Sequence, residues 1–109
     1  MSRPTDLVQV PLDLLVLKVF APGPMHGWAI GQCIGQISGE VLQVGQGALY
    51  PALHALEQND WITAGWVLSE NHPRAKYYTL TMAGRRILEQ EAAQWERLSA
   101  AVSPMVRTT

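Results

Sequence analysis

The sequence has little of what several classes of protein require. It contains one cysteine, Cys33, which excludes an internal disulfide and a zinc cluster held by several thiolates. No run of about 18 apolar residues occurs, so we expect no membrane-spanning helix and no membrane partner. The apolar stretch near the N-terminus has no basic lead-in and no small-residue cleavage site. We therefore expect no signal peptide and a cytoplasmic location.

An excess of charge of one sign is also lacking. The chain carries 8 Lys and Arg against 9 Asp and Glu, which is a formal net charge of −1. Such a chain has no overall attraction to phosphate, so binding to nucleic acid would depend on local clusters of positive charge. The three histidines, His26, His54 and His72, are spread over different segments without the i, i+4 spacing of a metal site. We predict no bound metal.

The residue patterns of catalysis are missing as well. The sequence shows no nucleophile paired with a base and no glycine-rich phosphate loop. The acidic residues near the C-terminus, Glu89, Glu91 and Glu96, fit a solvated helical face better than a catalytic pair of carboxylates. We therefore predict that the protein is not an enzyme and needs no cofactor.

Three segments in the first half of the chain predict helices. Residues 10–20 are apolar on nearly all sides, which predicts a helix that is covered in part by a partner subunit. In residues 27–38 and 47–58, apolar side chains recur at helical spacing. Pro51 lacks an N–H group and should lie in the first turn of its helix, so this helix should start between Gln46 and Ala48.

The second half of the chain predicts a β-hairpin followed by a long helix. Residues 61–68 and 76–80 are rich in β-forming residues, and they flank a turn-like segment, 69–75. Thr81 suits the N-cap of a helix that should end near Val102, because Pro104 discourages continuation. Trp61 and Trp66 are predicted to lie in or near the core, and Trp28 is predicted to be a packing residue of the helix at 27–38.

The final helix carries a seam of apolar residues at steps of four, three, three and four, which is typical of a coiled coil. Its members are Leu88, Ala92, Trp95, Leu98 and Val102. The predicted dimer interface joins part of this seam to the first helix. It consists of Leu14, Leu17, Leu88, Trp95, Leu98 and Val102.

This order of elements predicts a winged helix-turn-helix, a mainly α-helical fold with a small β-hairpin. We expect a DNA-binding domain over residues 1–80, and a C-terminal dimerisation helix and tail over residues 81–109. The helix at 47–58 is then the one that enters the major groove of double-stranded DNA. The predicted DNA-contacting residues are Gln46, Gly47, Tyr50, Pro51 and His54 on this helix, and Arg74 and Lys76 on the hairpin.

Both groups of residues also have a simpler interpretation. Tyr50 and His54 fit an ordinary half-exposed helical face, and Arg74 and Lys76 fit a solvated loop. The helix at 47–58 takes the place of the recognition helix of this fold, and the hairpin at 61–80 takes the place of its wing. These positions favour DNA contact. No Lys or Arg lies on the recognition helix, so this helix cannot read guanine with a bidentate arginine.

Several segments resemble the PadR family of regulators. In chain order they are residues 11–17 (PLDLLVL), 23–30 (GPMHGWAI), 47–57 (GALYPALHALE), 74–81 (RAKYYTLT) and 83–85 (AGR). The resemblance implies a homodimer built through the first and last helices, and a DNA-binding repressor that is often relieved by a small molecule. The single C-terminal helix is similar to the short branch of the family. Ala55 departs from the pattern, because family members often have an arginine there.

The position of Trp95 in the seam has two interpretations. It either packs in the dimer interface or, together with Ala92, lines a pocket for a small aromatic ligand, as the resemblance implies. Two functions also stay open. One is a sequence-specific DNA-binding regulator, a repressor relieved by a ligand, and the other is a winged-helix dimer that binds protein instead of DNA. Salt-dependent DNA binding would separate these two functions.

Overall fold

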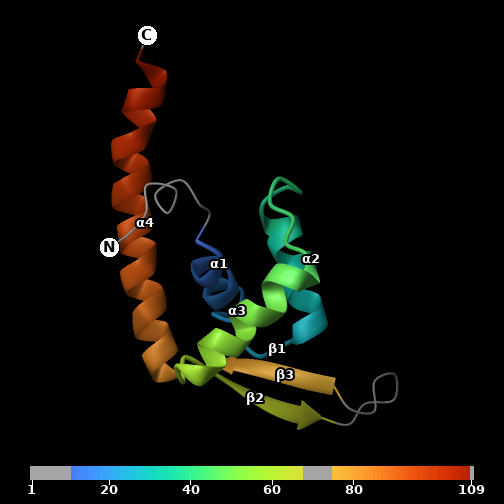
Figure 1. The fold of residues 1–109 in the computed structure, drawn as a ribbon. Helices are drawn as coiled ribbons and strands as arrows, with labels where there is room; N and C mark the ends of the chain where they lie inside the picture. Colours follow the sequence, from blue (N-terminus) through green and yellow to red (C-terminus); the bar gives the residue numbers. More distant parts are fainter. Residues whose placement is uncertain (1–10, 68–74, 109) are drawn as a thin grey trace.

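The computed structural model describes residues 11–67 and 75–108, and it has the predicted order of elements (Figure 1). The helices and strands of this part of the chain are α1 (Leu12–Val19), β1 (Met25–His26), α2 (Gly27–Ile37), α3 (Gln46–Gln58), β2 (Ile62–Val67), β3 (Ala75–Leu80) and α4 (Met82–Arg107). Figure 1 shows α1 between α4 on one side and the pair α2 and α3 on the other, with the sheet at the base. Within the described residues, no helix has both the length and the apolar character that crossing a bilayer needs.

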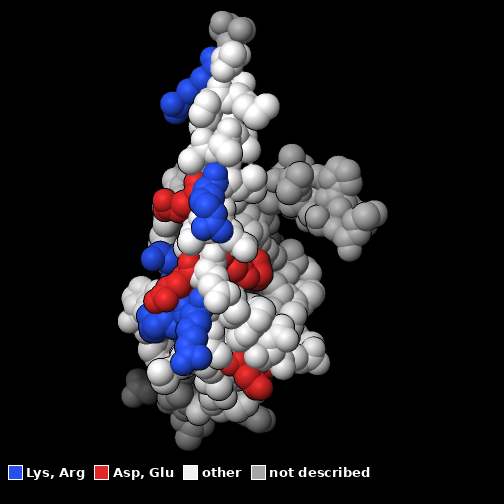
Figure 2. Space-filling view, turned by 90° about the vertical axis from the view of Figure 1, so that its left-hand side faces the viewer, with Lys and Arg blue, Asp and Glu red and all other residues white. Residues whose placement is uncertain are grey.

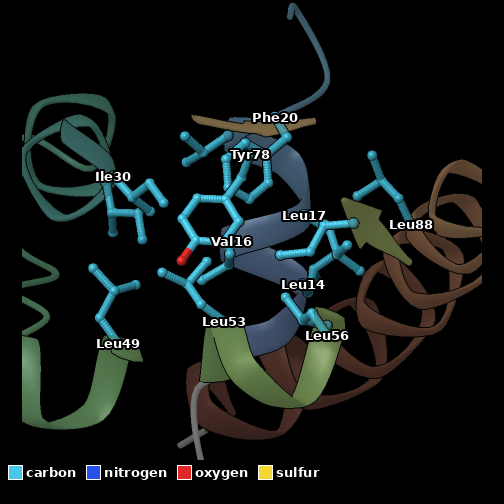
Figure 3. Packing of buried hydrophobic residues seen from close by; sticks show 13 residues of the cluster. Leu14, Val16, Leu17, Phe20, Ile30, Leu49, Leu53, Leu56, Tyr78 and Leu88 are labelled. Atoms are coloured by element: carbon cyan, nitrogen blue, oxygen red, sulfur yellow. The ribbon is translucent and has the colours of Figure 1, made fainter. Parts of the chain in front are cut away.

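Helix α1 forms the centre of the hydrophobic core. Its Val16 and Leu17 side chains are fully buried, and it contacts α2, α3 and α4. Figure 3 shows apolar side chains from α2, α3, β3 and α4 grouped around it. Each large aliphatic side chain buried in this way contributes about 1.5–3 kcal/mol to stability.

Leu14 and Leu17, which the sequence predicts to belong to the dimer interface, have little surface left for a partner, and the interface itself stays a prediction. Both are buried within their own subunit, close to Leu56 and Leu88 (Figure 3). Leu88 was assigned to the same interface and is likewise buried, at 7% exposure. The reason is that α4 folds back along α1 in the same chain and covers the face that the sequence left for a partner.

The sheet has one strand more than the predicted hairpin. Strand β3 lies in the middle, with β2 and β1 antiparallel on either side of it. In the β1 pairing, Met25 lies opposite Tyr78, and His26 lies opposite Tyr77. A strand of two residues is too short to show the alternating pattern that predicts strands.

The start of α4 is held by Thr81, as the sequence predicts. The Thr81 hydroxyl accepts a hydrogen bond from the Gly84 N–H at 2.9 Å, and it donates one to the Asp60 carbonyl at 2.7 Å. The Thr81 N–H donates to the Trp61 carbonyl at 3.0 Å. These bonds seat the first turn of α4 on the segment that precedes β2.

The predicted end of α4 near Val102 is wrong, because the helix continues through Pro104 to Arg107. A proline removes one backbone hydrogen bond and crowds the preceding turn. Here this cost falls on an exposed stretch. The last turn is closed by Thr108, whose N–H and hydroxyl both donate to the Pro104 carbonyl, at 3.0 and 2.6 Å. The helix of 26 residues therefore extends beyond the other elements (Figure 1).

Candidate nucleic-acid interface

Helix α3 has one buried face and one exposed polar face. Its inner face is formed by Leu49, Leu53 and Leu56, which are buried against the core. Its outer face carries the predicted DNA-contacting residues, and all five are exposed: Gln46, Gly47, Tyr50, Pro51 and His54. The leucines fix the rotation of the helix, and this rotation turns the amide, hydroxyl and imidazole groups outward.

The prediction for Pro51 is correct in part. Helix α3 starts at Gln46, which is within the predicted range, but Pro51 then lies in the second turn and not in the first. The missing N–H leaves the carbonyl of Gly47 without its helical donor. Gly47 and Pro51 are both exposed, so solvent can hydrogen-bond this carbonyl. The lost bond therefore costs less here than it would in the core.

The wing is joined to α3 through Lys76. The Lys76 ammonium lies 3.8 Å from Glu57 Oε1 at the end of α3, and both side chains are about one-third exposed. It also lies over the rings of Tyr78 and Trp66, at 5.2 and 5.8 Å from their centroids. The Lys76 ammonium thus makes an ion pair with Glu57 and cation–π contacts with two aromatic rings. Its role as a phosphate contact stays a prediction, and Arg74 lies outside the described residues.

Trp66, which the sequence predicts in or near the core, and Trp28, which it predicts as a packing residue of the second helix, are both exposed. Trp28 is 52% exposed and Trp66 is 61% exposed. The Trp28 indole stacks on the His26 ring, with 5.2 Å between the ring centroids. The centroids of the His26 and Tyr77 rings are 3.8 Å apart. An aromatic group therefore stands at the start of α2. The sequence offered no signal for it, because β1 and β3 assemble it through tertiary pairing.

The outer face of α3 borders on a cleft of about 600 Å³ between α2 and α3. Gln46 and Tyr50 line this cleft, and Trp28 lines it from the side of α2. None of the described lining residues is Lys or Arg. Contact with DNA on this surface would therefore depend on hydroxyl and amide groups and on the free N–H groups at the start of α3.

The seam on α4 divides into two parts. Leu88 is buried and Ala92 packs partly buried against the core of its own subunit. Trp95 and Val102 are 42% and 45% exposed, and Leu98 is partly exposed. Further along the helix, Met105 and Val106 are more than three-quarters exposed. The surface available to a partner therefore begins at Trp95.

Two carboxyl groups, Asp13 on α1 and Glu91 on α4, lie in hydrogen-bond contact. Burial, together with a hydrogen bond to Asp13 and repulsion by the Asp13 charge, raises the pKa of Glu91 from 4.5 to about 7. Asp13 Oδ1 also accepts a hydrogen bond from the Leu14 N–H at 3.0 Å. The sequence predicts a solvated Glu91, because nothing in it shows that Asp13 on another helix lies beside it.

In the space-filling view, acidic and basic side chains alternate along this side of α4 (Figure 2).

The prediction of no metal site still stands as a prediction. Within residues 11–67 and 75–108, no group of three His, Cys, Asp or Glu side chains lies close enough to hold an ion.

Comparison with known proteins identifies relatives across most of the chain. A model of the transcriptional regulator PadR-like family matches residues 16–90. An uncharacterized 37.1 kDa protein in transposon TN4556 of Streptomyces fradiae is 42% identical over 90 residues, or 83% of this chain. The chain spans only about a quarter (24%) of the length of that relative.

Solved structures match the fold. A transcriptional regulator from Clostridium thermocellum matches with a TM-score of 0.82 and 24% identity, over 94% of this chain and 99% of that one. Bacillus subtilis PadR in complex with operator DNA matches with a TM-score of 0.68 and 23% identity, over 75% of this chain and 46% of that one. At these identities, the matches establish a shared architecture.

Proposed function

Because the chain belongs to the PadR-like family of transcriptional regulators, we propose that it binds specific sequences of double-stranded DNA as a homodimer and represses transcription there. The observation that carries this proposal is the outer face of α3. Five residues of that face are exposed and polar or small, while the opposite face is locked into the core by leucines. That arrangement suits a helix lying in a major groove.

The chemistry of α3 supports a particular way of binding. The Tyr50 hydroxyl and the free N–H groups at the start of the helix suit phosphate oxygens, which position a protein on the duplex. The Gln46 amide can donate to and accept from one base edge, an arrangement that favours adenine. Because positive charge is scarce, few counterions are released on binding. The candidate phosphate contacts of each subunit are Arg74, Lys76 and Arg3, a further basic residue near the N-terminus. With all six contacts of a dimer made, the slope of log K against log salt would reach only about −5.

The exposed half of α4 supports the homodimer. Trp95, Leu98 and Val102, followed by Met105 and Val106, form an apolar strip that a monomer would leave in water. Pairing this strip across a two-fold axis would hold two copies of α3 in successive major grooves, about 34 Å apart. The DNA site should then be an inverted repeat.

Relief by a ligand forms the last part of the proposal. Trp95 and Ala92 would line a site for a small aromatic molecule near the two-fold axis. Such a ligand would act as an inducer only if it bound more tightly to the dimer whose α3 helices are wrongly spaced for DNA. A regulator of this kind works where its DNA lies, so the proposal includes the cytoplasmic location expected from the sequence.

The test is DNA binding by the full chain. Duplexes selected from a random library supply the site, and affinity is measured at several salt concentrations. Tyr50→Phe should weaken binding by removing one hydroxyl, and Tyr50→Ala should weaken it further. Gln94→Ala, on the exposed side of α4, is the control that should leave binding unchanged. Full affinity of Tyr50→Ala for the selected site would rule out this placement of the recognition helix.

One alternative function has a specific observation in its favour. The recognition helix carries no Lys or Arg and the formal net charge is −1, which suits a winged-helix dimer that binds a protein partner. Salt-dependent binding to a selected duplex would exclude this alternative, whereas the absence of any such binding would favour it.

A further inference from the structure

The cleft between α2 and α3 has a floor without side chains. Gly27, Gly31 and Gly35 follow each other at four-residue spacing on α2, and all three line the cleft. A Cβ atom at Gly31 would lie 3.2 Å from the Val44 carbonyl oxygen. Glycine is among the least favourable residues in the interior of a helix. At Gly31 and Gly35, the absence of a side chain lets the segment that follows α2 approach the helix closely, whereas a Cβ atom at Gly27 would meet the Tyr78 ring at 3.1 Å.

Glu40 lies in the segment that follows α2, and its backbone conformation is unusual. Its φ is +67°, directly after Gly39 with a φ of +63°. Its N–H donates to the Gly35 carbonyl at 2.7 Å and so closes the end of α2. Residues other than glycine, asparagine and aspartate are uncommon in the left-handed backbone region. Strained residues of this kind cluster at functional sites.

The same conformation sets the Glu40 carboxylate against the helix. Glu40 Oε2 lies 3.3 Å from the position that a Gly35 Cβ would take. Glu40 is the one charged residue among the described residues that line the cleft. The negative end of the α2 dipole lies at the same place. A surface meant for DNA alone gains nothing from this charge, because it repels phosphate.

The rest of the lining indicates which ligand would fit. Trp28 and Tyr50 are about half exposed and present aromatic rings, on which a flat group can stack and to which a cation is attracted. Four glutamine side chains, Gln32, Gln36, Gln43 and Gln46, supply hydrogen-bond donors and acceptors. The volume of about 600 Å³ lies within the range of small-molecule sites.

We propose that the α2/α3 cleft binds a small, flat organic cation above Glu40, and that the bound cation excludes DNA from α3. Exclusion follows because the ligand and the DNA would both use Gln46 and Tyr50. This second half rests on the proposed DNA-binding function, whereas the binding of the cation does not. The site is also separate from the expected ligand position at Trp95 on α4.

The test uses two probes of nearly the same shape. Benzamidinium carries a positive charge, and benzamide is its neutral counterpart. Binding is followed through the indole N–H signals in NMR spectra of the full chain, assigned with Trp28→Phe and Trp95→Phe. Benzamidinium should shift the Trp28 signal in a saturable way and leave the Trp95 signal in place. Benzamide should bind more weakly.

The decisive variant is Glu40→Gln, which removes the charge and keeps the size of the side chain. It should weaken benzamidinium binding about tenfold and leave benzamide binding unchanged. Glu89→Gln, an exposed carboxylate on α4, is the matched control and should behave like the parent chain. Unchanged thermal unfolding of both variants shows that the fold is retained.

Three results would overturn the proposal. They are the absence of a Trp28 shift at about 10 mM benzamidinium, equal binding to parent and Glu40→Gln, and a shift confined to Trp95. Saturating benzamidinium should also weaken binding to the selected duplex, and unchanged DNA affinity would overturn the exclusion of DNA. If the chain binds no DNA at all, Glu40-dependent cation binding still stands, so failure of the proposed function remains distinguishable.

Discussion

Gly84, at the start of α4, should tolerate no side chain even though it lies in a helix. Replacing a helical glycine by alanine normally stabilises a protein by about 1 kcal/mol. At this position, however, a Cβ atom would collide with the backbone carbonyl of Trp61 and approach Leu80 Cδ1 at 2.9 Å. A backbone carbonyl cannot rotate away as a side chain can, so the first turn of α4 would have to move.

The cost of that movement can be worked out from the bonds it strains. The Trp61 carbonyl accepts the hydrogen bond from the Thr81 N–H, which is worth about 1 kcal/mol. The Thr81 cap on Gly84 is worth about 0.5–2 kcal/mol, and overpacking costs about 1–3 kcal/mol. Against the helix-forming gain of about 1 kcal/mol, we expect Gly84→Ala to destabilise the protein by about 1.5–5 kcal/mol.

Gly47 provides the matched control. It also lies in a helix, but no atom lies within 4 Å of a Cβ built there, so Gly47→Ala should be neutral or stabilising by up to about 1 kcal/mol. The assay is urea unfolding followed by circular dichroism, at one fixed protein concentration because association adds to stability. A Gly84→Ala chain as stable as the parent would refute the close approach between α4 and the Trp61 carbonyl.

Three further predictions concern α4 and the wing. The raised pKa of Glu91 means that the folded chain binds a proton more tightly than the unfolded chain. The stabilisation that comes from protonated Glu91 is therefore complete below about pH 4.5, and it is lost as the pH rises through about 7. Unfolding titrations between these pH values should show a loss of about 1 kcal/mol after solvent screening, and Glu91→Gln should reduce it. In the proposed homodimer, Leu98→Glu should shift the equilibrium toward monomer in sedimentation experiments, because it places an unpaired charge in the apolar strip, whereas Glu96→Gln should not. A double-mutant cycle on Lys76 and Glu57 should give a coupling energy of at most about 1 kcal/mol that falls with salt, and a larger, salt-insensitive value would contradict an exposed pair.

Much of the fold could be predicted because its determinants are local in the sequence. Apolar residues at helical spacing predicted α2 and α3, and Thr81 predicted the start of α4. The predictions of the family and of the winged-helix architecture are confirmed, and the family is one of transcriptional regulators rather than of enzymes. The outward direction of Tyr50 and His54 also follows from sequence, because leucines on the opposite face determine it.

Tertiary structure alone decided which surfaces are covered and which charges meet. The run of apolar residues in α1 required burial, but nothing in it shows that α4 of the same chain covers Leu14 and Leu17. The pairing of Lys76 with Glu57 and the contact of Glu91 with Asp13 join residues far apart in the chain. Local periodicity records which side of an element is apolar, and it holds no information on which distant element packs there. The composition of each helix was therefore readable from the sequence, whereas the cleft, the carboxyl pair and the exposed half of α4 came from the packing of helices against one another.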